Sequence, residues 1–178
     1  MATIVDIRDL EVEATTDAGR RVEIIRKVGF TIEDGEIVAL IGESGSGKST
    51  IALTLMGYTR PGCRISGGSV MVGGKDMVRL SERERQAIRG TDVAYVPQSA
   101  AAAFNPASTI MDQVIEVTRI HGLMSDAEAR IRAVELFRAL SLPEPDTIGD
   151  RYPHQVSGGQ LQRLSAAMAL IGGPKLMI

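Results

Sequence analysis

The chain has 178 residues, of which 44% are hydrophobic and 24% are charged, and its formal net charge is −2. A chain of this length and composition fits one globular domain, and the near-neutral charge with three Phe, three Tyr and no Trp argues against a nucleic-acid-binding surface. The single cysteine, Cys63, excludes an internal disulfide, and no apolar run approaches the ~20 residues that a transmembrane helix needs.

Five strands are predicted from the pattern of apolar residues. Alternating or short apolar stretches predict three of them, over residues 3–14, 21–25 and 69–72. The continuous apolar run 37–41 predicts a strand that is buried on both faces of a sheet, and 93–96 predicts another buried strand.

Helices are predicted between these strands. One helix should begin at Lys48 and end near Gly57, a residue suited to the position after a helix, and another should cover 109–121. The pairs Ser81/Glu84 and Ser125/Glu128 have the spacing of a capping box at a helix start. The alternation of strands and helices favours an α/β architecture. The helix after Ser125 is expected to bury one face, made of Ala127, Ile131, Val134, Phe137 and Leu140.

Residues 42–50 read GESGSGKST and fit the phosphate-loop pattern G-x-x-x-x-G-K-[S/T] at every fixed position. Glycines let successive backbone N–H groups face one concavity, and the following helix adds positive potential at its N-terminus. Lys48 can bridge the outer two phosphates of a nucleotide, and the Ser49 hydroxyl can coordinate Mg²⁺. A flexible loop that matches by chance is the alternative, but the flanking strand and helix supply the context that the motif requires. The candidate nucleotide-binding residues are Gly42, Glu43, Ser44, Gly45, Ser46, Gly47, Lys48, Ser49 and Thr50.

A second glycine motif, VSGGQ, occupies residues 156–160. Ser157 and Gln160 have the spacing of a capping box, which accounts for both of them. It does not account for Gly158 and Gly159, each of which costs roughly 1 kcal/mol relative to Ala in a helix interior. An anion that approaches the helix N-terminus would favour a bare backbone there, so this motif alone fits either a plain helix cap or an anion site.

Together the two motifs resemble those of the ATP-binding cassette (ABC) ATPases, whose signature sequence has the form LSGGQ. Between them, VAYVPQ at 93–98 is similar to the strand that leads into the Q-loop of the family, so Gln98 matches the glutamine that senses Mg²⁺ and the γ-phosphate. The resemblance runs from about residue 4 to the last residue. Four stretches are similar to the dipeptide and oligopeptide importer branch, namely GESGSGKS, SERERQAIRG (81–90), FNP (104–106) and YPHQVSGGQ (152–160).

The resemblance implies an α/β fold, a P-loop NTPase core of the ABC ATPase type with an antiparallel β subdomain at the N-terminus and a helical subdomain that carries the signature. It divides the chain into 1–97 (β subdomain and phosphate-loop part of the core), 98–165 (Q-loop and helical subdomain) and 166–178 (end of the signature helix and start of the Walker B strand). In the family the Walker B Asp and Glu and the switch His lie beyond the position of Ile178. The C-terminal part of the core is therefore expected to be missing, and the chain alone is expected to bind nucleotide but to hydrolyse it negligibly.

In the family, two ATPase subunits sandwich Mg²⁺ and ATP head to tail. The resemblance thus assigns the phosphate loop and Gln98 to the nucleotide of one site, with Ser49 and Gln98 reaching Mg²⁺. It assigns Ser157, Gly158, Gly159 and Gln160 to the nucleotide held by the partner. The implied function is energy coupling in a peptide importer, peripheral at the cytoplasmic face of the inner membrane. The implied partners are a second ABC ATPase subunit, membrane permease subunits that contact the segment 99–106, and indirectly a periplasmic or extracellular solute-binding protein, with no nucleic acid.

Other functions are compatible with parts of the pattern. A soluble ABC ATPase of DNA repair shares both motifs, but 99–151 shows no sustained heptad repeat of the kind those proteins insert. A truncated, non-hydrolytic nucleotide-binding subunit stays open, as does an ABC ATPase for nickel, another solute or phosphonate metabolism. Ala14 matches the position where many members stack an aromatic ring on adenine, so the stacking partner is undecided.

Overall fold

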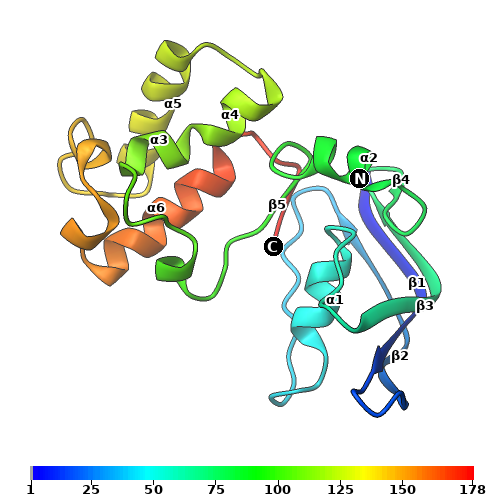
Figure 1. Ribbon diagram of the computed structural model, residues 1–178. Helices are drawn as coiled ribbons and strands as arrows, with labels where there is room; N and C mark the ends of the chain where they lie inside the picture. The colour runs from blue at the N-terminus through cyan, green and yellow to red at the C-terminus, as the bar shows by residue number, and fades with distance from the viewer. Residues whose placement is uncertain (1) are drawn as a thin grey trace. The chain divides into compact units, whose positions relative to one another are not determined.

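Figure 1 shows the computed structural model, which describes residues 2–178 as two compact units, one ending at Arg89 and the other running from Gly90 to Ile178. The first unit contains most of the sheet structure, and the second contains most of the helices. The first unit consists of β1 (Thr3–Thr15), β2 (Arg21–Glu33), α1 (Lys48–Thr54), β3 (Cys63–Val72), β4 (Lys75–Asp76) and α2 (Glu82–Ile88).

The first unit is built on an antiparallel sheet with the strand order β2-β1-β3-β4. β1 is the central strand, and its inward face buries Val5, Ile7, Leu10 and Val12 almost completely. The step from Ile7 to Leu10 breaks the two-residue period, and the strand register shifts there at a bulge where Asp9 has a φ of 46°. The extra residue keeps the apolar side chains on the same face of the sheet.

The sheet confirms three predicted strands, although β2 and β3 are longer than expected. The prediction of a buried strand over 37–41 is wrong: this run is irregular and exposed, with Ile37 96% and Ile41 93% exposed. A strand is stabilised by ladder hydrogen bonds to a neighbour, and no strand among residues 2–178 pairs with this run. Apolar composition alone therefore did not specify a strand here.

The second unit packs its helices around one apolar core. It contains β5 (Val93–Ala94), α3 (Ile110–Val114), α4 (Glu116–His121), α5 (Asp126–Ala139), α6 (Gly158–Leu170), β6 (Leu176–Met177) and three short 3₁₀ turns at Ala100–Ala102, Ile148–Asp150 and Pro153–Gln155. The helix predicted over 109–121 is thus two short helices that meet at Ile115.

α5 buries only part of the predicted face. Phe137 is fully buried, and Val134 and Leu140 are half-buried against the same core, but Ala127 and Ile131 are exposed. The buried stripe consists instead of Ala129, Ala133 and Phe137, spaced by four residues on one side of the helix. Two alanines allow close packing in the core, whereas the larger side chain of Ile131 lies outside it.

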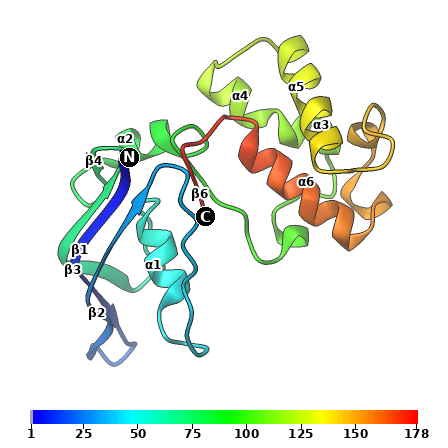
Figure 2. The ribbon, with the colours of Figure 1, turned by 180° about the vertical axis from the view of Figure 1, so that it is seen from behind.

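The strand predicted over 93–96 is confirmed only at Val93–Ala94, which pairs in parallel with β6. Figure 2 shows β6 at the end of the chain, beside the segment that contains β5. The pairing continues one step further, because the Val96 amide donates to the Ile178 carbonyl at 2.8 Å. The antiparallel sheet, the helices and this parallel pair confirm the α/β fold class.

Candidate functional site

The loop over residues 42–50 leads into α1 in the first unit, and glycine is required at two of its positions. Gly45 and Gly47 have φ angles of 83° and 91°, a region that other residues rarely adopt. A Cβ atom on Gly47 would lie 2.3 Å from Cδ1 of Ile25, so a side chain there would force the buried Ile25 side chain of β2 to shift. These glycines are therefore explained by the structure of the unit itself.

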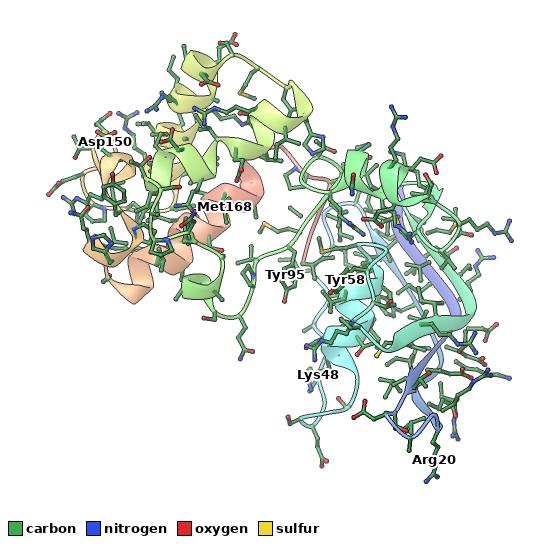
Figure 3. The ribbon with its side chains drawn as sticks, in the orientation of Figure 1. Arg20, Lys48, Tyr58, Tyr95, Asp150 and Met168 are labelled. Carbon is green, nitrogen blue, oxygen red and sulfur yellow. The ribbon has the colours of Figure 1, made fainter. Side chains whose placement is uncertain are left out.

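Lys48 lies across the loop that precedes it, as Figure 3 shows at the start of α1. Its Nζ donates to the carbonyls of Gly42 at 2.8 Å and Glu43 at 2.6 Å, and approaches the Ser46 hydroxyl at 3.3 Å. These bonds place the ammonium group inside the bend of the loop. The arrangement provides a point charge for an anion bound at the same bend.

The first turn of α1 leaves its backbone donors available. Gly47 is the N-cap and has no side chain to accept a hydrogen bond, whereas a helix leaves its first N–H groups without an intrahelical partner. The Ser49 side chain in this turn is exposed and offers a hard oxygen of the kind that Mg²⁺ prefers. The loop thus fits a phosphate group with its magnesium ion, which are the groups that the motif predicts.

The N-terminus of α6 in the second unit is capped by side chains. The Ser157 hydroxyl accepts from the Gln160 amide at 3.3 Å, and the Gln160 side chain accepts from the Ser157 amide at 2.7 Å. Gly158 and Gly159 have ordinary helical backbones, are exposed, and would place a Cβ in open space. Nothing within this unit requires either residue to be glycine.

Gln98 lies at an exposed bend after β5 in the second unit. His154 is exposed and stacks on Tyr152 with ring centroids 5.8 Å apart, which agrees with a surface position. Ala14 in β1 lies between Val22 and Cys63, neither of which is aromatic, so no stacking ring for adenine is found at its strand neighbours.

Two residues that the sequence did not single out organise the second unit. Arg163 reaches from α6 to the carbonyls of Leu140 and Ser141 at the end of α5, at 3.2 and 2.5 Å, and thereby fixes the signature helix against its neighbour. Gln113 bonds through both side-chain atoms to Asn105, which lies in the segment after Gln98. The Arg163 contacts join residues 22 and 23 positions apart and the Gln113 contacts span eight positions, so neither has the short spacing of a recognisable local motif.

An open groove of about 480 Å³ lies beside the segment that follows Gln98. Its polar wall contains Asp112 and Glu116, and Arg119 is tied to Asp126 at 2.8 Å. Ile120, which is 71% exposed, supplies an apolar side chain. The complete lining is Ala103, Asn105, Ser108, Asp112, Gln113, Glu116, Arg119 and Ile120.

Within residues 2–178, no cluster of three or more His, Cys, Asp or Glu side chains could hold a metal ion by itself. None of the helices in this range is long and apolar enough to cross a bilayer.

Residues 25–178 match the protein family described as ABC transporter. The chain is 40% identical to the peptidoglycan transport ATP-binding protein YejF of Agrobacterium fabrum, over 98% of this chain and 32% of that protein. It is 36% identical to the dipeptide transport ATP-binding protein DppD of Bacillus subtilis, over 100% of this chain and 53% of that protein. The oligopeptide transport ATP-binding protein OppD of the same organism is 37% identical over 98% of this chain and 49% of that protein. The chain thus spans about half the length of these relatives or less.

A solved structure supports the same likeness at the level of the fold. The dimeric post-hydrolysis state of the ATP-binding cassette MJ0796 bound to ADP and Pi matches with a TM-score of 0.84 and 27% identity. The match covers 97% of this chain and 72% of that chain.

Proposed function

The chain belongs to the ABC transporter family, and from this premise we propose that it is the ATP-binding, energy-coupling subunit of an importer for peptides or peptide-containing solutes. The solute class is proposed from the relatives, which are named as transport ATP-binding proteins for dipeptides, oligopeptides and peptidoglycan. The chain spans about half of those relatives or less. The proposals on ATP hydrolysis, solute and partners therefore apply to a protein of the relatives' length. In such a protein, we propose that residues outside these 178 contribute to hydrolysis.

The nucleotide phosphates bind at the loop over 42–50 in this proposal. The first-turn amides of α1 and the Lys48 ammonium, which donates to the loop carbonyls of Gly42 and Glu43 in this structure, would hold the phosphate oxygens. The Ser49 hydroxyl and the Gln98 side-chain oxygen are the proposed ligands of Mg²⁺, which neutralises phosphate charge when bound. We assign phosphate binding to residues 1–97, magnesium sensing and the signature to 98–165, and the end of the core to 166–178.

The signature motif serves a nucleotide held by a second subunit in this proposal. The observation that carries it is the open space over Gly158 and Gly159, where this unit has no need for glycine. A γ-phosphate that approaches the exposed N-terminus of α6 would need that space, since a methyl group there would block contact with the backbone. The matched cassette is a dimer with ADP and Pi, which supports a two-subunit arrangement.

The groove beside residues 103–120 is the proposed docking surface for the permease. It combines carboxylates at Asp112 and Glu116 with the exposed apolar side chain of Ile120. Docking at this surface would place the subunit at the cytoplasmic face of the membrane, with the solute-binding protein coupled only indirectly.

The proposal is tested by measuring Mg-ATP binding in the parent protein and in Lys48→Ala. Losing a charge-assisted contact of 1.5–3 kcal/mol should weaken binding about ten- to hundredfold. Arg83→Ala is the control, because Arg83 is an exposed cation in the same unit, away from the loop. Unchanged binding in Lys48→Ala would contradict the phosphate role. Purification of the intact protein without any membrane permease would contradict the transport role.

A further inference from the structure

The C-terminal end of α1 is closed by backbone bonds around Gly57. The Gly57 amide donates to the Thr54 carbonyl at 2.9 Å, and the Tyr58 amide donates to the Leu53 carbonyl at 3.1 Å. Gly57 has a φ of 63°, so these bonds form the Schellman arrangement that often ends a helix. The carbonyls of Met56 and Gly57 lie just beyond this closure and need donors from elsewhere.

Arg89 supplies those donors from the end of α2. Its Nε donates to the Met56 carbonyl at 3.0 Å, and its Nη2 approaches the Gly57 carbonyl at 3.4 Å. The Arg89 side chain is only 23% exposed, so these bonds are partly shielded from water. The cation also lies where the helix dipole is negative, which is the favourable end for a positive charge.

Glu82 fixes the direction of this guanidinium group. Its Oε1 accepts from Arg89 Nη1 at 2.6 Å, while its Oε2 accepts from Arg85 Nε at 3.1 Å. The hydrogen bond from Arg89 is the main cause that lowers the pKa of Glu82, with Arg85 adding to it. Arg85 in turn packs against Gly57, where an added Cβ would lie 2.4 Å from its Cδ.

The opposite end of the same helix carries the phosphate-binding residues. Figure 3 shows Lys48 at the start of α1 and Tyr58 beyond its other end. The seven residues of α1 span about 10 Å, so the two ends of the helix are only about two turns apart. Its apolar contacts, such as those of Ile51 and Leu55, are non-directional, whereas the guanidinium fork fixes direction as well as distance.

We propose that Arg89, held by Glu82, is a positioning residue that sets the place of Lys48 and Ser49 from the far end of α1. The inference rests on the proposed binding of Mg-ATP at the loop. Arg89 touches no phosphate in this account. It acts through α1, so its loss lets the helix shift along its axis and moves the phosphate-binding groups together.

The test measures the dissociation constant for Mg-ATP and the thermal unfolding of the intact protein in a set of variants. Arg89→Ala should weaken Mg-ATP binding roughly three- to tenfold. Arg89→Lys should recover part of the affinity, because an ammonium group can reach the Met56 carbonyl but cannot also bridge Gly57 and Glu82. Arg83→Ala, an exposed arginine of the same helix, should bind as the parent does.

The outcomes separate this inference from the proposed function. If the parent protein does not bind Mg-ATP, the proposed function fails and this inference fails with it. If the parent binds and Arg89→Ala binds equally well, with only a lower unfolding temperature, Arg89 is structural and the inference alone is overturned. Should Arg89→Ala fail to fold, Glu82→Gln decides, since it keeps the side-chain shape and should weaken binding about twofold to threefold. Unchanged affinity in Glu82→Gln overturns the inference.

Discussion

The N-termini of α1 and α6 both follow or contain a pair of glycines, yet the reasons for the glycines differ. At α1, Gly45 and Gly47 have positive φ angles, and Gly47 lies against Ile25 of β2. At α6, Gly158 and Gly159 have helical backbones with open space around them. The first pair is required by the unit in which it lies, while the second pair is not.

The two helices also differ in capping: the helix whose glycines are structurally required has no side-chain cap, and the other helix has one. α6 is closed by the reciprocal bonds of Ser157 and Gln160, whereas α1 begins at Gly47 without any side-chain cap. A helix that leaves its first amides uncapped can bind an anion through them directly. At the capped helix, Gly158 and Gly159 have no side chains, so the backbone at this end stays accessible to a group from another molecule. The structure thus separates an uncapped helix start with structurally required glycines from a capped helix start whose glycines the unit does not require, which matches the two different roles that we propose for them.

The largest effect is expected for Gly47→Ala. The left-handed conformation costs a non-glycine residue about 1–2 kcal/mol, and the contact with Ile25 adds about 1–3 kcal/mol of overpacking. The free energy of unfolding should therefore fall by about 2–5 kcal/mol, measured by urea denaturation. Gly45→Ala is the matched control, because its Cβ would meet nothing within 4 Å and it should lose only the conformational part. Equal losses in both variants would contradict the role of Ile25.

Gly158→Ala, at the start of α6, should lower ATPase activity without lowering the stability of the fold. Alanine favours the helix, so the free energy of unfolding should stay constant or rise by up to about 1 kcal/mol. ATP hydrolysis by the assembled transporter should fall at least about tenfold, because the methyl group blocks the approach of the partner's nucleotide. A variant that retains full ATPase activity would remove the support for the signature role.

A smaller effect is expected for Ser157→Ala, which removes the cap of α6. Losing an N-cap side chain costs about 1 kcal/mol, measured as the change in the free energy of unfolding. Ser157→Asp should restore the cap and most of the stability, since aspartate is among the favoured N-cap residues. If Ser157→Ala is as stable as the parent, the capping box does not close this helix in solution.

The smallest expected effect is the pH dependence of the capping boxes, which should be present in α2 and α5 and absent in α6. Hydrogen bonds from Ser81 and Ser125 lower the pKa values of Glu84 and Glu128 below their usual 4.5. A carboxyl group whose pKa is lower in the folded state stabilises the fold at pH values above its unfolded-state pKa. This stabilisation is lost as the pH falls through its folded-state pKa. The box of α6 uses Gln160, which does not titrate.

The amide proton shifts of the three capping boxes, followed by NMR during acidification, test this difference. The amides of Glu84 and Glu128 should move together with protonation of their own side chains. The Gln160 amide should stay constant over the same range. A parallel shift at Gln160 would show that the whole protein is responding to acid, and not the individual caps.

The features that the sequence predicted well depend on short-range chemistry. The phosphate loop, the three capping boxes and the end of α1 near Gly57 all involve residues within a few positions of one another, so their spacing is visible in the chain. The roles of the loop, Gln98 and the signature toward nucleotide stay predictions. They depend on groups outside the chain.

The features that the sequence missed depend on distant partners. The apolar run 37–41 has strand composition, but composition does not supply the neighbour that a strand requires. On α5, Ala133 is fully buried whereas Ile131 is 63% exposed, because the side of the helix that faces the core is decided by the elements packed against it. The contacts of Arg89 and Arg163 join separate elements, so only the folded structure reveals them.

The central claim is that the loop of one subunit and the signature of another act on the same nucleotide. It is tested by mixing Lys48→Ala with Gly158→Ala in the intact protein and measuring ATP hydrolysis. In a mixed pair, one site combines the intact loop of the Gly158→Ala subunit with the intact signature of the Lys48→Ala subunit. The account predicts that the mixture hydrolyses ATP faster than either impaired variant alone. A mixture no more active than the two variants measured separately would contradict it.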